Sequence, residues 1–153
     1  MPNSRFRSPS DVLDFAIQRE IEAADGYGRM AEMAIAPGLR AFLFELKAEE
    51  ENHRRLLEGM TAERLAGPLP APVADMKLSD SLEDVIPAPD MTLQELLIFA
   101  ARKEKKAEDL YAGLARRPEF AAQRRTFEFL AAQERTHKLK LEAEYEAYVL
   151  SED

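Results

Sequence analysis

A set of four polar residues occurs twice in this chain at a constant distance. Each set contains a glutamate, a tyrosine seven residues later, and a Glu-x-x-His step that begins thirty residues after the first glutamate. The first set is Glu20, Tyr27, Glu50 and His53, and its counterpart 84 positions later is Glu104, Tyr111, Glu134 and His137. The two histidines of these sets are the only ones in the sequence. The repeat predicts a duplicated helical hairpin.

These polar residues fall on the apolar faces of the predicted helices. Alternating steps of four and three residues follow one face of a helix. From the first predicted helix they give Leu13, Ile17, Glu20, Ala24, Tyr27, Ala31 and Ala34. The same steps place Glu104 and both Glu-x-x-His pairs among apolar residues. We therefore expect an all-α fold, an antiparallel four-helix bundle, with the polar sets facing its interior.

Four glutamates in one apolar interior need a source of positive charge. An unpaired buried carboxylate costs several kcal/mol, whereas two divalent cations would balance the four negative charges. Neutral imidazoles would add nitrogen ligands without adding charge. The competing interpretation, surface hydrogen bonds between Glu and His without a metal, leaves the charges unpaired in the core. The charge balance therefore predicts a dinuclear metal site.

The pattern resembles that of a known superfamily. One glutamate from each of two helices, with Glu-x-x-His from each of the other two, is the ligand pattern of ferritin-like di-iron proteins. Within that superfamily, a glutamate followed seven residues later by tyrosine in the first helix of each hairpin most resembles rubrerythrins. The resemblance covers roughly residues 13–148 and implies a ferritin-like bundle that holds two iron ions. Manganese, zinc or a mixed pair also suit such ligands.

Six residues are the expected metal ligands. They are Glu20, Glu50, His53, Glu104, Glu134 and His137. Glu50 and Glu134 each lie one turn from a histidine and are placed to bridge the two ions, while each histidine would bind one ion from outside. The resemblance to rubrerythrins makes the remaining two glutamates the terminal carboxylates.

Other residues near these ligands have two interpretations each. Tyr27 and Tyr111 lie two turns along the same faces, where they either fill the core or donate hydrogen bonds that orient a ligand carboxylate. Glu49 and Glu51 flank a predicted ligand, and their simplest interpretation is as solvated charges. The sequence leaves the roles of the tyrosines open.

Glu108 breaks the symmetry of the repeat. It lies on the predicted inner face one turn after Glu104, where the first repeat has Ala24. Rubrerythrins have an additional carboxylate three residues after the ligand in this helix, and here that position is Ala107. Glu108 could substitute as a seventh ligand, or it could bend towards solvent.

A proline-rich segment separates the two hairpins. We expect hairpin one over about residues 9–65, a crossover over about 66–91 and hairpin two over about 92–149, within a single domain spanning 1–153. If hairpin two starts at the same end of the bundle as hairpin one, the segment must travel the bundle's length, about 35 Å for helices of roughly 24 residues. A flexible linker between independent hairpins would instead expose both apolar faces.

Local signals set the predicted helix starts. Ser8 is the expected N-cap of the first helix. Thr92 and Glu95 form the Thr-x-x-Glu pattern of a capping box, which opens the third helix. Pro118 is expected to start the fourth helix.

Composition narrows the possible partners and compartment. The chain has 21 basic and 29 acidic residues among 153, a net charge of −8, which makes nucleic acid and anionic membranes poor partners. No stretch approaches 18 consecutive apolar residues, and the first ten residues contain no apolar run, so we expect a soluble cytoplasmic protein. The absence of cysteine excludes disulfides, thiolate catalysis and iron–sulfur clusters.

The resemblance implies a reaction. Full-length rubrerythrins carry a rubredoxin-like domain with four cysteines that feeds electrons to the di-iron site, so a chain without cysteine would need an external electron donor protein. The expected function is a non-haem di-iron oxidoreductase that reduces peroxide or O₂. A ferroxidase or other iron-handling protein and a non-catalytic metal-binding bundle are the alternatives. A homodimer is expected, and the long connection would permit exchange of hairpins between subunits.

Overall fold

A computed structural model describes residues 8–60 and 90–151. Within these residues it contains four α-helices, one short 3₁₀ helix and no strand. In chain order the elements are α1 (Pro9–Met33), α2 (Pro37–Glu58), α3 (Leu93–Ala115), η2 (Pro118–Gln123) and α4 (Arg124–Ser151). The expected all-α four-helix bundle is confirmed. No helix in the described part of the chain is both long and apolar enough to cross a lipid bilayer.

The predicted caps fix the starts of α1 and α3. Ser8 has an extended backbone, and its side chain accepts a 3.3 Å hydrogen bond from the backbone N–H of Asp11. Thr92 and Glu95 form a reciprocal capping box, in which each side chain accepts a hydrogen bond from the backbone N–H of the other residue. These bonds satisfy N–H groups that have no partner within the helix.

The start of α4 differs from the prediction. Pro118 opens η2, and α4 begins only at Arg124. Phe120, inside η2, departs from helical geometry with φ −112° and ψ 25°. Its side chain is fully buried and meets the ring of Phe127 edge-on at 5.5 Å between centroids. Burial of Phe120 in the core therefore accompanies a bend that the sequence pattern did not reveal.

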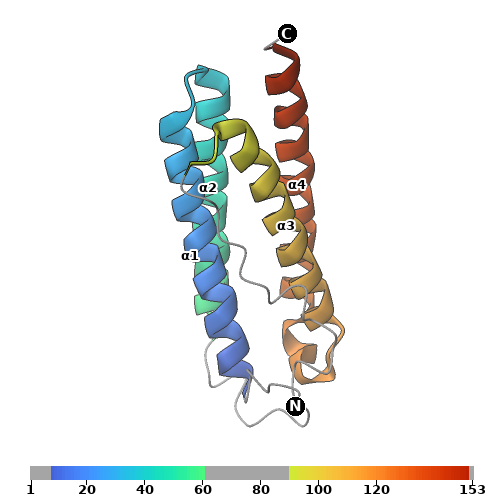
Figure 1. The fold of residues 1–153 in the computed structure, drawn as a ribbon. Coiled ribbons are helices and arrows are strands. Elements are labelled where there is room, and N and C mark those ends of the chain that lie inside the picture. The colour runs from blue at the N-terminus through green and yellow to red at the C-terminus, as the bar shows by residue number, and fades with distance from the viewer. Residues whose placement is uncertain (1–7, 61–89, 152–153) are drawn as a thin grey trace.

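The helices form two antiparallel pairs that pack together (Figure 1). α1 packs along α2, and α3 packs along α4. α3 starts at the end of the bundle opposite to the start of α1, whereas the estimate of the crossover's length assumed that both hairpins start at one end. Because α2 already returns the chain to the end where α1 starts, this opposite start is what requires a connection along the bundle. Residues 66–89 of the predicted crossover lie outside the described residues, as do residues 61–65 of predicted hairpin one.

Two hydrophobic clusters fill the two ends of the bundle. The cluster at the start of α1 and α4 includes Val12, Leu13, Leu57, Leu110, Tyr111, Phe120 and Phe127. The cluster at the opposite end includes Tyr27, Met30, Leu43, Leu46, Leu97 and Leu141. In each α-helix the predicted ligand glutamate lies in sequence between members of the two clusters. The two apolar ends therefore enclose a polar layer midway along the bundle.

Candidate metal centre

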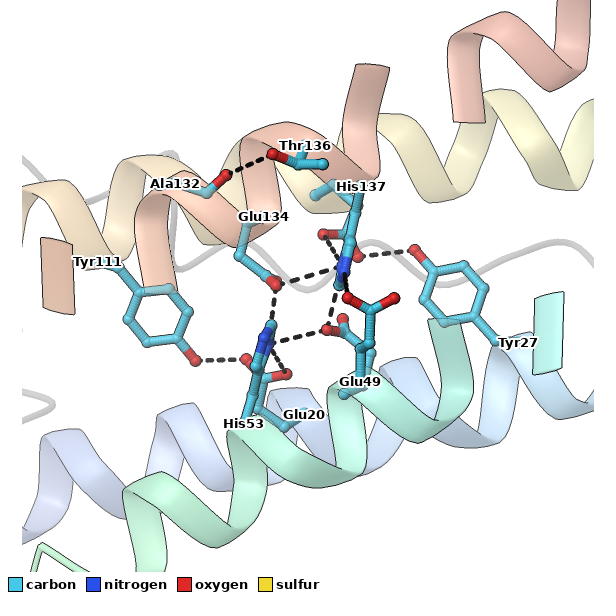
Figure 2. Close-up of polar contacts among 11 residues, drawn as sticks. Glu20, Tyr27, Glu49, His53, Tyr111, Ala132, Glu134, Thr136 and His137 are labelled. Atoms are coloured by element: carbon cyan, nitrogen blue, oxygen red, sulfur yellow. Dashed lines mark hydrogen bonds and ion pairs between the residues drawn. The ribbon is translucent and has the colours of Figure 1, made fainter. Parts of the chain in front are cut away.

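Each of the four α-helices contributes to one polar cluster inside the bundle (Figure 2). α1 and α3 each supply one glutamate, and α2 and α4 each supply a Glu-x-x-His pair. The members are Glu20, Glu50, His53, Glu104, Glu134 and His137, all at most 2% exposed. These six are the buried polar side chains of the described residues, together with Gln123. The structure thus brings together all six residues that the sequence singled out as ligands.

The cluster consists of two overlapping groups of ligand atoms. In each group, one nitrogen or oxygen from every member lies within 4.8 Å of the others, which is close enough to surround one metal ion. The first group is Glu20, Glu50, His53 and Glu134, and the second is Glu50, Glu104, Glu134 and His137. Glu50 and Glu134 belong to both groups. The geometry is that of two adjacent cation sites with two shared carboxylates.

Both imidazoles direct Nδ1 towards the carboxylates. His53 Nδ1 lies 3.0 Å from Glu50 Oε1, 3.0 Å from Glu134 Oε1 and 3.6 Å from Glu20 Oε1. His137 Nδ1 lies 3.3 Å from Glu50 Oε1 and 3.6 Å from Glu134 Oε1. The two rings are stacked, with 5.5 Å between centroids and 12° between planes.

The donor atoms of this cluster fit a pair of cations. Seven of its buried side-chain atoms have no hydrogen-bond partner: both Oε atoms of Glu50, one oxygen of each other glutamate, and Nδ1 of each histidine. Native interiors rarely leave buried polar atoms unpaired, so each such atom calls for an explanation. Divalent ions at the two positions would accept lone pairs from these atoms and balance four carboxylate charges.

The pKa values show the cost of this cluster when no cation balances it. Burial, followed by repulsion from neighbouring carboxylates, raises the pKa values of Glu50 and Glu134 well above normal. Burial alone would lower the pKa values of His53 and His137, but the close approach and negative charge of the carboxylates raise both. Burial also opposes ionisation of Glu104, yet His137, whose Nδ1 lies 3.4 Å from Glu104 Oε2, gives a lowered pKa. Protons therefore take the place of cations in the metal-free cluster.

The two tyrosines connect the hairpins crosswise. Tyr27 of α1 donates a 2.7 Å hydrogen bond to Glu104 of α3, and Tyr111 of α3 donates a 2.5 Å bond to Glu20 of α1 (Figure 2). Both hydroxyls are buried, and burial raises both pKa values well above normal, so the tyrosines act as neutral donors. Each tyrosine therefore fixes the glutamate that the first helix of the other hairpin contributes to the cluster. The same side chains also belong to the hydrophobic clusters, so they fill the core as well.

Glu49 has a role that the sequence interpretation missed. One oxygen of its carboxylate lies 3.3 Å from Nε2 of His137, although its side chain is 37% exposed (Figure 2). The interpretation of Glu49 as a solvated charge is therefore wrong. Such a contact fixes the ring of a metal-binding histidine and its proton position. Glu51, in contrast, pairs with Lys47 on the helix surface at 3.1 Å.

Glu108 does not join the cluster. It belongs to neither ligand group, its side chain is 20% exposed, and its carboxylate lies 4.0 Å from Lys105 Nζ on the same helix. A step of four residues turns a side chain about 40° further around the helix than a full turn, which carries Glu108 away from the face of Glu104. Of the two alternatives for Glu108, the structure favours a side chain directed towards solvent over a seventh ligand.

The fold and the site together define a class of protein: a four-helix bundle with a buried carboxylate and histidine cluster suited to two metal ions. The model of the rubrerythrin family matches residues 11–145, most of the chain. The chain therefore belongs to the rubrerythrin family, a ferritin-like di-iron family, as the resemblance in its motifs predicted. Searches of curated proteins and of solved structures found no match.

Proposed function

We propose that this protein is a non-haem di-iron oxidoreductase that reduces hydrogen peroxide or O₂ with electrons from an external donor protein. The observation that carries the proposal is the pair of ligand groups that share Glu50 and Glu134. Two carboxylates that belong to both groups would hold two cations next to each other, and such a pair of metal ions would supply the electrons for reduction of an O–O bond. Family membership supports iron as the metal, and manganese and zinc are the alternatives with the same ligand preferences.

The residues of the chain have distinct roles in this proposal. Glu50 and Glu134 would bridge the ions, Glu20 and Glu104 would each bind one ion, and the histidines would complete the two sites through Nδ1. Bound iron(II) ions would supply one electron each, which together reduce an O–O bond without release of a radical. The bundle interior keeps bulk water away from the ligands, all of which are at most 2% exposed.

The two tyrosines would hold the terminal carboxylates in place during the reaction. Each hydroxyl uses its proton in a bond to a carboxylate oxygen, which leaves the other oxygen of Glu20 or Glu104 free to bind an ion. Carboxylates whose positions are fixed in this way would stabilise a more positive pair of ions without first having to be oriented. Tyr27 and Tyr111 are positioning residues in this view.

Metal analysis and rapid kinetics test the proposal. Protein purified from its native cells should contain about two iron ions per chain, the number the paired ligand groups predict. The anaerobic iron(II) protein should then be oxidised stoichiometrically by hydrogen peroxide in a stopped-flow experiment, with zinc-loaded protein as the inert control. Failure of peroxide and of O₂ to oxidise the iron(II) protein would remove the proposal. Oxidation by O₂ with uptake of many more than two ions would identify iron handling instead.

A further inference from the structure

A pocket of about 300 Å³ lies between α1 and α3 and reaches the candidate metal centre. Its walls are largely apolar and include Ala23, Met30, Leu96, Phe99 and Ala100. Tyr27 and Glu104, joined by their 2.7 Å hydrogen bond, also line it. The exposed side chains of Glu22 and Arg29 lie at its solvent side. The pocket therefore leads from solvent to one terminal ligand of one cation site.

Gly26 explains why this space is open. A Cβ atom added at Gly26 would meet no atom within 4 Å, so the pocket extends to the backbone of α1 at this point. The equivalent residue of the second hairpin, 84 positions later, is Leu110. Leu110 is 1% exposed and belongs to the hydrophobic cluster that surrounds Tyr111. The space next to Tyr27 thus lacks the side chain that the repeat places next to Tyr111.

The size and lining of the pocket suit an organic ligand better than hydrogen peroxide alone. A water molecule occupies about 30 Å³ in the liquid, and hydrogen peroxide is only slightly larger, so either would leave most of the pocket empty. Pockets of about this volume with apolar walls and a few polar groups at one end are typical of sites for small organic molecules. Here the polar end is formed by Glu104 and Tyr27.

We propose that the pocket between α1 and α3 binds the organic part of a small alkyl or aryl hydroperoxide and directs its O–O group towards Glu104. This inference rests on the proposed function. In the reaction, ROOH takes two electrons from two iron(II) ions and two protons from solvent. The O–O bond breaks to give the alcohol ROH and water, and two iron(III) ions remain for the external donor to reduce. Hydrogen peroxide would use the same path but gain nothing from the apolar walls.

Binding to the metal-free protein tests the pocket without relying on activity. The probe is 2-phenyl-2-propanol, the unreactive alcohol formed from cumene hydroperoxide, titrated into ¹⁵N-labelled protein and followed by NMR. In wild-type protein, the resonances of the lining residues should shift saturably. Gly26→Leu places in the pocket a leucine side chain like that of its counterpart Leu110, and it should bind the alcohol at least tenfold more weakly. Asp25→Leu adds the same side chain at an exposed neighbouring position outside the pocket and should bind as wild type does. Equal binding by Gly26→Leu would overturn the inference.

Kinetics of the iron(II) protein separate this inference from the proposed function. Wild-type protein should be oxidised by cumene hydroperoxide, and Gly26→Leu should slow that reaction at least tenfold more than it slows the reaction with hydrogen peroxide. Gly26→Ala, a smaller change that requires no movement of neighbours, should give an intermediate loss and serves if Gly26→Leu does not fold. Reaction with hydrogen peroxide but not with cumene hydroperoxide would overturn the pocket inference alone. No reaction with any oxidant would overturn the proposed function itself.

Discussion

The two halves of the candidate metal centre have matching ligands in unequal surroundings. Every ligand and both tyrosines recur 84 positions later, and their hydrogen bonds are equivalent in the two halves. The position beside the tyrosine is Gly26 in hairpin one and the buried Leu110 in hairpin two. Because Gly26 has no side chain, a pocket lies beside it and reaches Glu104, a member of the second ligand group. Charge balance constrains all the ligands alike, whereas packing around them is free to differ.

A second difference concerns the histidines. Glu49 contacts Nε2 of His137, whereas the equivalent residue of hairpin two is Gln133, which carries no charge. A carboxylate on the outer nitrogen makes a histidine a stronger electron donor to its metal than a neutral partner does. The pocket reaches Glu104, and Glu49 contacts His137, so both features belong to the same ligand group. The comparison suggests that the two ions would share ligands but not the same access or electronic environment.

Loss of a shared ligand should have the largest effect on metal binding, because it should remove both ions and with them any difference between the two sites. Glu50 belongs to both ligand groups, whereas Glu20 belongs to one. We expect Glu50→Ala to lose both ions, and Glu20→Ala to lose mainly one, with iron per chain measured by mass spectrometry after dialysis. Glu51→Ala, on the surface of the same helix, is the matched control and should keep its metal. Full retention of both ions by Glu50→Ala would contradict the shared role.

The pH dependence should have opposite signs with and without metal. Raised pKa values at Glu50, Glu134, His53 and His137 mean that the metal-free folded protein binds more protons than the unfolded chain between about pH 5 and 8. Its free energy of unfolding should therefore fall as pH rises through this range. The lowered pKa of Glu104 acts in the other direction, but only near and below its normal value of 4.5.

Metal binding reverses this trend because ions must displace those protons. Metal affinity, and the stabilisation it brings, should therefore increase from pH 5 to 8. Thermal unfolding of metal-free and iron-loaded protein across this range checks both slopes. Calorimetric titrations in buffers with different ionisation enthalpies should also show proton release on binding. Parallel slopes in the two forms would show that the cluster is not where the ions bind.

The crossed tyrosines should give a smaller effect that sharpens the comparison. Tyr27→Phe removes the bond to Glu104, and Tyr111→Phe removes the bond to Glu20. Loss of a hydrogen bond to a metal ligand typically lowers metal affinity about 10- to 100-fold. We expect Tyr27→Phe to weaken binding of the ion in the group that contains Glu104, and Tyr111→Phe to weaken binding of the ion in the group that contains Glu20. Competition with a chelator, which resolves two successive dissociation steps, measures each loss.

Exchange of the histidine partners should have the smallest effect. Glu49→Gln would replace the charged partner of His137 with a neutral one, and Gln133→Glu would place a carboxylate at the position that the repeat relates to Glu49. Because Glu49 is partly exposed, we expect a change of only about threefold to tenfold in the affinity of the ion bound to His137, at the low end for such contacts. Spectra of the cobalt-substituted protein should report whether the two ions become more alike. Unchanged spectra in both variants would show that the outer nitrogens do not matter.

The sequence predicted the helices and the six clustered residues because both depend on periodicity. A glutamate among apolar residues at helical spacing can be recognised in the sequence, and the repeat shows which helices of the two hairpins are equivalent. The contact of Glu49 with His137 was not predictable, because it joins α2 to α4 and depends on how the two hairpins face each other. The outward turn of Glu108 and the late start of α4 depend similarly on packing angles and on the burial of Phe120.

The length expected for the connection between the hairpins rested on a condition that the structure does not meet. The prolines predicted the connection, most of which lies outside the described residues, but the estimate of its length placed the start of hairpin two at the wrong end of the bundle. Sequence patterns define the direction of each chain segment only within a hairpin, since the tight turn between α1 and α2 forces them to be antiparallel. The relative direction of α1 and α3 is set by which ligands must meet, and it follows from the crossed contacts of Tyr27 and Tyr111.

The antiparallel placement of α1 and α3 means that exchanging the two hairpins reproduces the hydrogen bonds of the tyrosines and the two groups of candidate ligands. Two identical hairpins on separate polypeptides would satisfy that symmetry equally well, but any substitution in them would then alter both sides at once. A single polypeptide that contains both hairpins is free of this restriction. It can leave one approach open at Gly26 while Leu110 keeps the opposite one sealed. Linkage of the two repeats in one chain thus permits different access to the two sites, which a symmetric assembly of identical hairpins would not have.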